Sequence, residues 1–196
     1  MMLVPLQFSG AYEMLPLTYA IEDFISRVKV KGNLNPNIEG MTSVREKIVL
    51  ANPGSQTSRE NHIIITDLFF WENPEASFSI FPLILPVTME EFIGVSGLCH
   101  MGASDILWLT FSTEETGNAY DDGPIGDSYL GWICDVSKKL NDSEWGVDGL
   151  INLRETSNEF TNEKIEGLCI EFTHKTQPVM HMVSDNDDGE SKLFKL

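Results

Sequence analysis

Two nearly continuous apolar segments, separated by a short turn, most restrict how this chain can fold. The first runs from His62 to Glu72 and is rich in Ile, Thr and Phe, and the second runs from Ala76 to Leu85. Asn73-Pro74-Glu75 between them has the composition of a tight turn. A strand with one solvated face alternates apolar and polar residues, whereas these segments do not. We therefore predict a hairpin of two strands that lie centrally in a sheet and are buried on both faces.

Helical spacing of apolar residues predicts a helix over Pro16–Val30, which Gly32 can end. Thr88 and Glu91 have the spacing of a capping box, which predicts a short helix that starts near Val87 and ends near Gly94 or Gly97. Segment Tyr129–Leu140 is ambiguous, and its near-helical spacing favours a helix over a strand. We predict further strands in four segments: Arg45–Ala51, Ile106–Phe111, Ile165–Thr173 and Val179–Val183.

These elements predict an α+β fold, a single domain with an antiparallel or mixed β-sheet and two or three helices. The 196 residues fit one globular domain, 1–196. A boundary could fall only within the polar loop 113–127, which could equally be a long surface loop. The acidic segment 184–196 is expected to be a frayed tail.

The net charge of −17, from 13 basic and 30 acidic residues, disfavours binding to nucleic acids or to anionic membranes, since both need a basic face. No apolar segment is long enough to span a membrane, and the N-terminal residues do not resemble a signal peptide. Cys99, Cys134 and Cys169 are too few for a disulfide framework, so we expect free, mostly buried thiols in the cytoplasm.

The basic residues are segregated, because no Lys or Arg occurs between Glu60 and Ser137. Unpaired carboxylates stay in water, so this interval predicts a negative surface that attracts a protein with a basic surface. Trp145 lies in a polar segment and could be an exposed binding anchor or the lid of the core. The residues expected to bind the partner are Glu114, Glu115, Asp121, Asp122, Asp127 and Trp145.

No motif specifies a reaction, a metal or a cofactor. Adjacent Cys99 and His100 lack the ligand spacing of zinc sites, and the acidic loops do not match a calcium-binding template. Segment Gly94-Val95-Ser96-Gly97 is one residue short of a nucleophile elbow. Cys134 or Cys169 could meet His174 only through the tertiary structure.

The leading hypothesis is therefore a non-enzymatic protein–protein interaction module, such as an inhibitor, an immunity protein or a viral or phage accessory protein. Two alternatives remain at this point. One is a structural or assembly subunit of a larger particle, and the other is an enzyme with a dispersed Cys–His hydrolase-type site.

Overall fold

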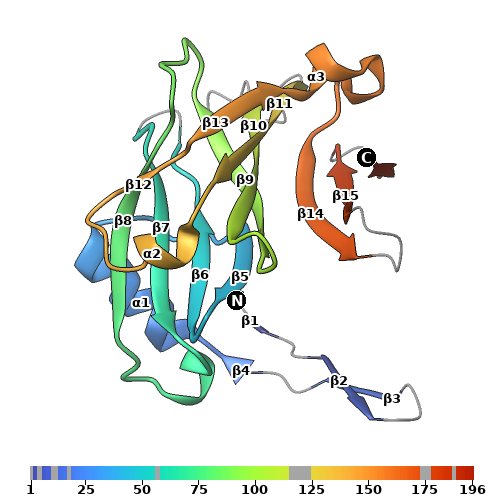
Figure 1. Cartoon of the computed structure of the whole chain (residues 1–196). Helices are drawn as coiled ribbons and strands as arrows, with labels where there is room; N and C mark the ends of the chain where they lie inside the picture. The colour runs from blue at the N-terminus through green and yellow to red at the C-terminus, as the bar shows by residue number, and fades with distance from the viewer. Residues whose placement is uncertain are drawn as a thin grey trace.

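The computed structural model describes residues 2–3, 6–9, 13–16, 19–55, 58–114, 125–172, 178–186 and 189–196. Side chains are described from residue 21 onward within these ranges, except at 114 and 125. Most of the ordered structure is strand, and twelve strands form three sheets of five, four and three strands. The prediction of an α+β fold is therefore wrong, because the protein is β-rich with short helices (Figure 1).

The five-stranded sheet has the strand order β12-β8-β7-β6-β5 and contains the predicted hairpin. Ile64 of β7 faces Ile80 of β8 in an antiparallel register, so the two apolar segments pair as predicted. The short β12 runs parallel to the end of β8. The strands are β5 (Gly40–Val44), β6 (Lys47–Asn52), β7 (Asn61–Asp67), β8 (Phe78–Ile84) and β12 (Trp145–Gly146).

The four-stranded sheet is antiparallel and has the order β13-β11-β10-β9. The three-stranded sheet is an antiparallel meander, β14-β15-β16. Near the N-terminus β1 pairs with β4, and β2 pairs with β3. The bounds of these strands are β9 (Ile93–Met101), β10 (Ile106–Glu114), β11 (Ile125–Ile133), β13 (Gly149–Asn152), β14 (Ile165–Phe172), β15 (Pro178–Asp185), β16 (Ser191–Lys195), β1 (Met2–Leu3), β2 (Leu6–Ser9), β3 (Glu13–Pro16) and β4 (Tyr19–Ala20).

Helices are short in the described ranges. The longest is α1 (Glu22–Gly32), which the predicted helix overlaps, although it starts later than Pro16. It ends at Asn33, a left-handed residue, and it carries acidic residues in its first turn and basic residues in its last, as the helix dipole favours. The others are α2 (Val136–Lys139), α3 (Leu153–Thr156) and the 3-10 turns η1 (Phe70–Glu72) and η2 (Asn158–Phe160).

The elements stack in layers, with α1 and the three-stranded sheet on opposite sides (Figure 1). Ile63 and Ile65 of β7 point into the core between the five-stranded and four-stranded sheets, whereas Ile64 points into the core under α1. A third core, which includes Phe160 and Met182, joins the four-stranded and three-stranded sheets. Burial of β7 on both faces is therefore confirmed, because layers cover both sides of the sheet. The same prediction is wrong for β8, where Ser79, Pro82 and Ile84 are exposed, because only the two-residue β12 lies beyond it in the sheet.

The helix predicted near Val87 and the predicted tail are wrong, and the helix predicted over Tyr129–Leu140 is correct only for 136–139. Residues 85–92 form a loop after β8, because Ile93 already begins the nine-residue strand β9. The first five residues of Tyr129–Leu140, 129–133, belong to β11, where Leu130 and Ile133 face different cores on opposite sides of the sheet, and the helical part is α2, Val136–Lys139. Segment 184–196 contains β16, whose Phe194 is buried.

The edge of β8 is covered by side chains from α1. Arg27 Nη2 donates a hydrogen bond to the backbone oxygen of Ala76, and Lys31 Nζ donates one to that of Phe78. Because these side chains of α1 cover the start of β8, where β12 does not pair, they block pairing with another chain there. None of the helices in the described ranges is long and apolar enough to cross a membrane.

Candidate functional site

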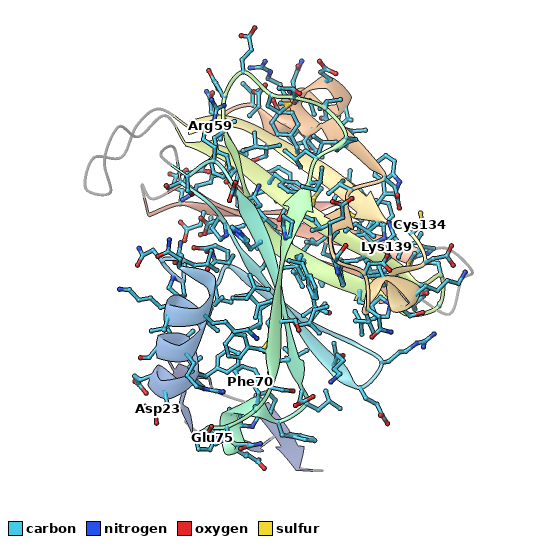
Figure 2. The ribbon with its side chains drawn as sticks, turned by 90° about the vertical axis from the view of Figure 1, so that its left-hand side faces the viewer. Asp23, Arg59, Phe70, Glu75, Cys134 and Lys139 are labelled. Atoms are coloured by element: carbon cyan, nitrogen blue, oxygen red, sulfur yellow. The ribbon has the colours of Figure 1, made fainter. Side chains whose placement is uncertain are left out.

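The candidate site is a groove of about 660 Å³ at one end of the five-stranded sheet. It is lined by the segment that leads into β7, by the end of β8 and by the loop between β8 and β9. Figure 2 shows Arg59, one of its lining residues, at the opposite end of the molecule from Glu75. The lining residues used below are Arg59, Glu60, His62, Ile84, Val87, Thr88 and Glu91.

Asn61 fixes the base of the groove. Its side chain is buried, its Nδ2 donates to the backbone oxygen of Ile93 at 2.8 Å, and its Oδ1 accepts from the backbone N–H of Val95 at 3.0 Å. Oδ1 also accepts from the backbone N–H of Gly54 at 3.3 Å. These bonds hold the starts of β7 and β9 together, so the loop between β8 and β9 has to fold back over the end of the sheet.

Arg59 holds that loop from the other side. Its backbone is left-handed, with a φ of 48°, and its Nη2 donates to the backbone oxygen of Glu90 at 2.7 Å. A bulky residue with positive φ is uncommon and persists where surrounding contacts impose it. The guanidinium of Arg59 therefore binds the backbone of the β8–β9 loop.

His62 is the titratable group set furthest into the groove. Burial lowers the pKa of its imidazole below 6.5, although Glu60 acts in the opposite direction. Its Nδ1 is buried and has no hydrogen-bond partner among the described residues, and its Nε2 lies 3.9 Å from Glu60 Oε2. Since the lowered pKa favours the neutral ring, His62 adds no positive charge at neutral pH.

Two carboxylates and an apolar wall complete the groove. Glu60 and Glu91 are exposed, and neither forms an ion pair with a lysine or arginine in the described part of the chain. Ile84 and Val87 are 47% and 53% exposed, so their side chains present apolar surface to solvent. Among the described lining residues Arg59 is the one lysine or arginine. The groove can therefore hold a cation at its carboxylates and an alkyl chain against its wall.

Of the six predicted partner-binding residues, the described structure places the side chains of Asp127 and Trp145. Glu115, Asp121, Asp122 and the side chain of Glu114 lie outside the described residues. Asp127 is engaged internally, because its Oδ1 lies 2.9 Å from Arg154 Nη1 and its Oδ2 accepts from Asn152.

Trp145 is fully buried in the core between the two larger sheets, so the exposed anchor is wrong and the alternative, a lid of the core, is correct. Its polar neighbours in sequence stay at the surface while β12 adds it to the edge of β8. A buried side chain cannot contact a partner, and Trp145 is therefore a core residue.

The cysteines are free, as predicted, but two of them are exposed: Cys134 and Cys169. Cys99 is half-buried, and burial raises the pKa of its thiol. The prediction that the three thiols are mostly buried is therefore wrong. Cys134 lies at the end of β11, and Cys169 lies on a sheet face that no described layer covers. His174, the proposed partner of either cysteine, lies outside the described residues.

The segment Gly94–Gly97 packs β9 against β14. Ser96 Oγ donates to the backbone oxygen of Ile165 at 2.6 Å, and a β-carbon on Gly97 would lie 3.1 Å from the backbone oxygen of Glu166. The absence of a side chain lets β9 and β14 approach closely. Ser96 is buried in this contact, so the partial nucleophile elbow has a structural role.

A second polar cluster combines the residue types of a catalytic triad in a different order. Asp105 lies at its centre, where it accepts from Ser137 Oγ at 2.6 Å and contacts His100 Nε2 at 3.3 Å. Burial acts to raise the pKa of Asp105, but the hydrogen bonds from Ser137 and His100 outweigh it and lower the pKa. Arg45 also donates to Ser137 Oγ. In a nucleophilic triad the histidine lies between the serine and the acid, whereas here the acid lies between the other two, so Ser137 is not activated. The cluster instead joins the β5–β6 turn, the β9–β10 turn and α2.

Sequence reasoning missed His62 and the groove. The available signal was the pair Glu60 and His62, which lie two residues apart and therefore on one side of an extended segment. Their convergence with Glu91 depends on the fold of the β8–β9 loop, which the capping-box pattern predicted incorrectly.

Among the described residues, no group of three or more His, Cys, Asp or Glu could hold a metal ion. One protein-family model, described as a family of unknown function (DUF6929), matches residues 1–196. Neither a curated protein nor a solved structure matches the chain.

Proposed function

We propose that the chain, which belongs to the DUF6929 family, is a protein-binding module that holds a basic side chain of its partner in the groove beside β7. The observation that carries this proposal is the combination of Glu60 and Glu91 with a neutral His62 and an exposed apolar wall in one groove. Glu60 and Glu91 fall in the interval without lysine or arginine.

A lysine or arginine of the partner fits this chemistry in two ways. Its alkyl chain can lie along Ile84 and Val87, which removes apolar surface from water. Its charged end can reach the carboxylates of Glu60 and Glu91, which form no ion pair with a lysine or arginine among the described residues. The neutral imidazole of His62 does not repel the incoming charge at neutral pH.

The charge of the whole chain supports the same class of partner. A net charge of −17 attracts basic surfaces at long range and speeds association, especially at low salt. We place this function in the cytoplasm, where reducing conditions keep the three cysteines free. The alternative of an assembly subunit stays a separate prediction, and size-exclusion chromatography with light scattering tests it.

The test uses the full chain and a set of peptides in which a lysine or arginine is flanked by apolar residues, with matched peptides in which glutamine replaces the basic residue. Fluorescence anisotropy measures the Kd at several salt concentrations. We expect the double variant Glu60→Gln, Glu91→Gln to weaken binding of the basic peptides about tenfold, roughly the 1.4 kcal/mol of an exposed charge-assisted contact.

The control removes the same charge elsewhere. Glu75 and Glu144 are exposed and do not line the groove, so the double variant Glu75→Gln, Glu144→Gln should bind like the parent chain. Equal weakening by both double variants would show that bulk charge alone attracts the peptides, and the proposal would fail. Failure of every basic peptide to bind would overturn it as well.

A further inference from the structure

The outer face of the three-stranded sheet places a cysteine, a histidine and a lysine in one row. Cys169 of β14 lies opposite His181 of β15, and His181 lies opposite Lys195 of β16. Residues directly opposite in antiparallel strands share a face and have β-carbons about 5 Å apart. The other face of the sheet packs into the core through Met182 and Phe194, so the row faces away from the core.

His181 is oriented by an acid on the same face. Its Nε2 lies 2.9 Å from Oε2 of Glu171, which follows Cys169 by two residues in β14. A carboxylate that accepts from Nε2 fixes the tautomer with the proton on that nitrogen and leaves Nδ1 as a proton acceptor. The row thus contains a thiol, a base opposite it and an acid that sets the state of the base.

We propose that Cys169 is a thiol-modification site that undergoes exchange with low-molecular-weight disulfides of the glutathione disulfide type. The Cys169 thiol gives its proton to His181 Nδ1, and the resulting thiolate attacks one sulfur of the disulfide. The S–S bond of the reagent breaks as the bond to Cys169 Sγ forms, and the departing glutathione thiolate takes the proton from His181. The products are the mixed disulfide and one glutathione, so atoms and electrons balance.

Lys195 supplies charge complementarity with the reagent. It is exposed and lies in the same row as His181, so its ammonium can attract a carboxylate of glutathione. The charged and titratable groups around Cys169 are Glu171 on its own strand, His181 on β15, Lys195 on β16 and Cys99 on β9, whose half-buried thiol interacts electrostatically with Cys169.

The other two cysteines lack this arrangement and provide internal controls. Cys99 is half-buried, and its raised pKa disfavours the thiolate. Cys134 is exposed, and it follows the end of β11 at Ile133, so no histidine lies opposite it in the sheet; the nearby Asp135 and Asp148 each form an ion pair with a lysine. Accessibility alone would make Cys134 and Cys169 equally reactive, whereas the proposal makes Cys169 faster.

The experiment incubates the reduced full chain with glutathione disulfide and follows the modification of each cysteine by peptide mass spectrometry. We expect Cys169 to react at least about tenfold faster than Cys134. The variant His181→Gln should slow Cys169 by about tenfold while the rate at Cys134 stays constant, which also reports that the fold is intact. A ratio near one, or a ratio that His181→Gln leaves unchanged, overturns the proposal.

A second variant tests the charge of Lys195 separately from the proton acceptor His181. Lys195→Gln should slow the reaction of Cys169 with glutathione disulfide but not with the uncharged 2-hydroxyethyl disulfide, because that reagent carries no carboxylate. Equal rates of the parent and Lys195→Gln with glutathione disulfide would refute the role of Lys195. Since Cys169 does not line the groove, this result is independent of the peptide-binding test.

Discussion

The side-chain amide of Asn61 donates a 2.8 Å hydrogen bond to the backbone oxygen of Ile93 and thereby joins the starts of β7 and β9. The replacement Asn61→Ala leaves this oxygen and the buried N–H of Val95 without a side-chain partner. We expect the free energy of unfolding to fall by about 2 to 3 kcal/mol, measured by urea titration. The exposed Asn141 offers a matched control, since Asn141→Ala should change stability by less than about 0.5 kcal/mol. Similar losses in both variants would contradict the assigned role.

The stability of the protein should fall as the pH drops through the range in which histidine titrates. Burial lowers the pKa of folded His62 below 6.5, so the unfolded state binds more protons than the folded state below that pH. The stabilisation is therefore present above about pH 6.5 and is lost as the pH falls through the lower pKa of the folded state. Urea titrations from about pH 7.5 to 5.5 should show this slope, and His62→Gln should flatten it. An unchanged slope in the variant would assign the effect to other groups.

Glu163 is a buried acid just before β14, and its carboxylate contacts β15, β16 and Asn186. It forms an ion pair with Lys192 and accepts from Ser184 Oγ at 2.7 Å and from Asn186 Nδ2 at 3.2 Å. Lys192 is half-exposed and can return to water, so we expect Glu163→Ala to lose about 2 to 3 kcal/mol, mainly from the unpaired Ser184 and Asn186. Glu159→Ala, at an exposed position, should be nearly neutral by the same thermal or urea measurement.

The same carboxyl predicts sensitivity to acid. Burial acts to raise the pKa of Glu163, but its hydrogen bonds to Lys192, Ser184 and Asn186 outweigh burial and lower the pKa. Its contribution is therefore complete above the unfolded value of about 4.3 and is lost as the pH falls through the lower value of the folded state. Glu163→Gln should reduce the loss of stability below about pH 4.5, and an identical acid transition in parent and variant would contradict this assignment.

Gly97 and Gly146 make opposite predictions for the same substitution. A β-carbon on Gly97 would lie 3.1 Å from the backbone oxygen of Glu166 and 3.3 Å from the Cα of Gly167, so β9 and β14 would have to separate. Gly97→Ala should therefore destabilise the protein by about 1 to 3 kcal/mol. Gly146→Ala meets no atom within 4 Å and should change stability by less than about 0.5 kcal/mol. Equal effects on the urea midpoint would exclude close strand packing as the reason.

The central hairpin follows from its amino-acid composition alone. Three consecutive isoleucines, Ile63 to Ile65, leave neither face of a strand polar, so burial on both faces follows from the composition of the segment alone. The net negative charge of the chain and the free state of its cysteines can also be inferred from the sequence. The sequence did not reveal most of β9, because the local capping pattern of Thr88 and Glu91 favours a helix that the sheet overrides.

Contacts between residues far apart in the chain depend on the tertiary fold. Trp145 stands among polar neighbours in sequence and is nevertheless buried, because β12 joins the edge of the five-stranded sheet. Glu60, His62 and Glu91 share a groove since Asn61 ties β9 to β7, and Cys169 faces His181 through the register of β14 and β15. Local sequence sets which strands can form and which faces are apolar. Strand register and layer order arise from packing across the whole chain, and these place the charged and nucleophilic side chains.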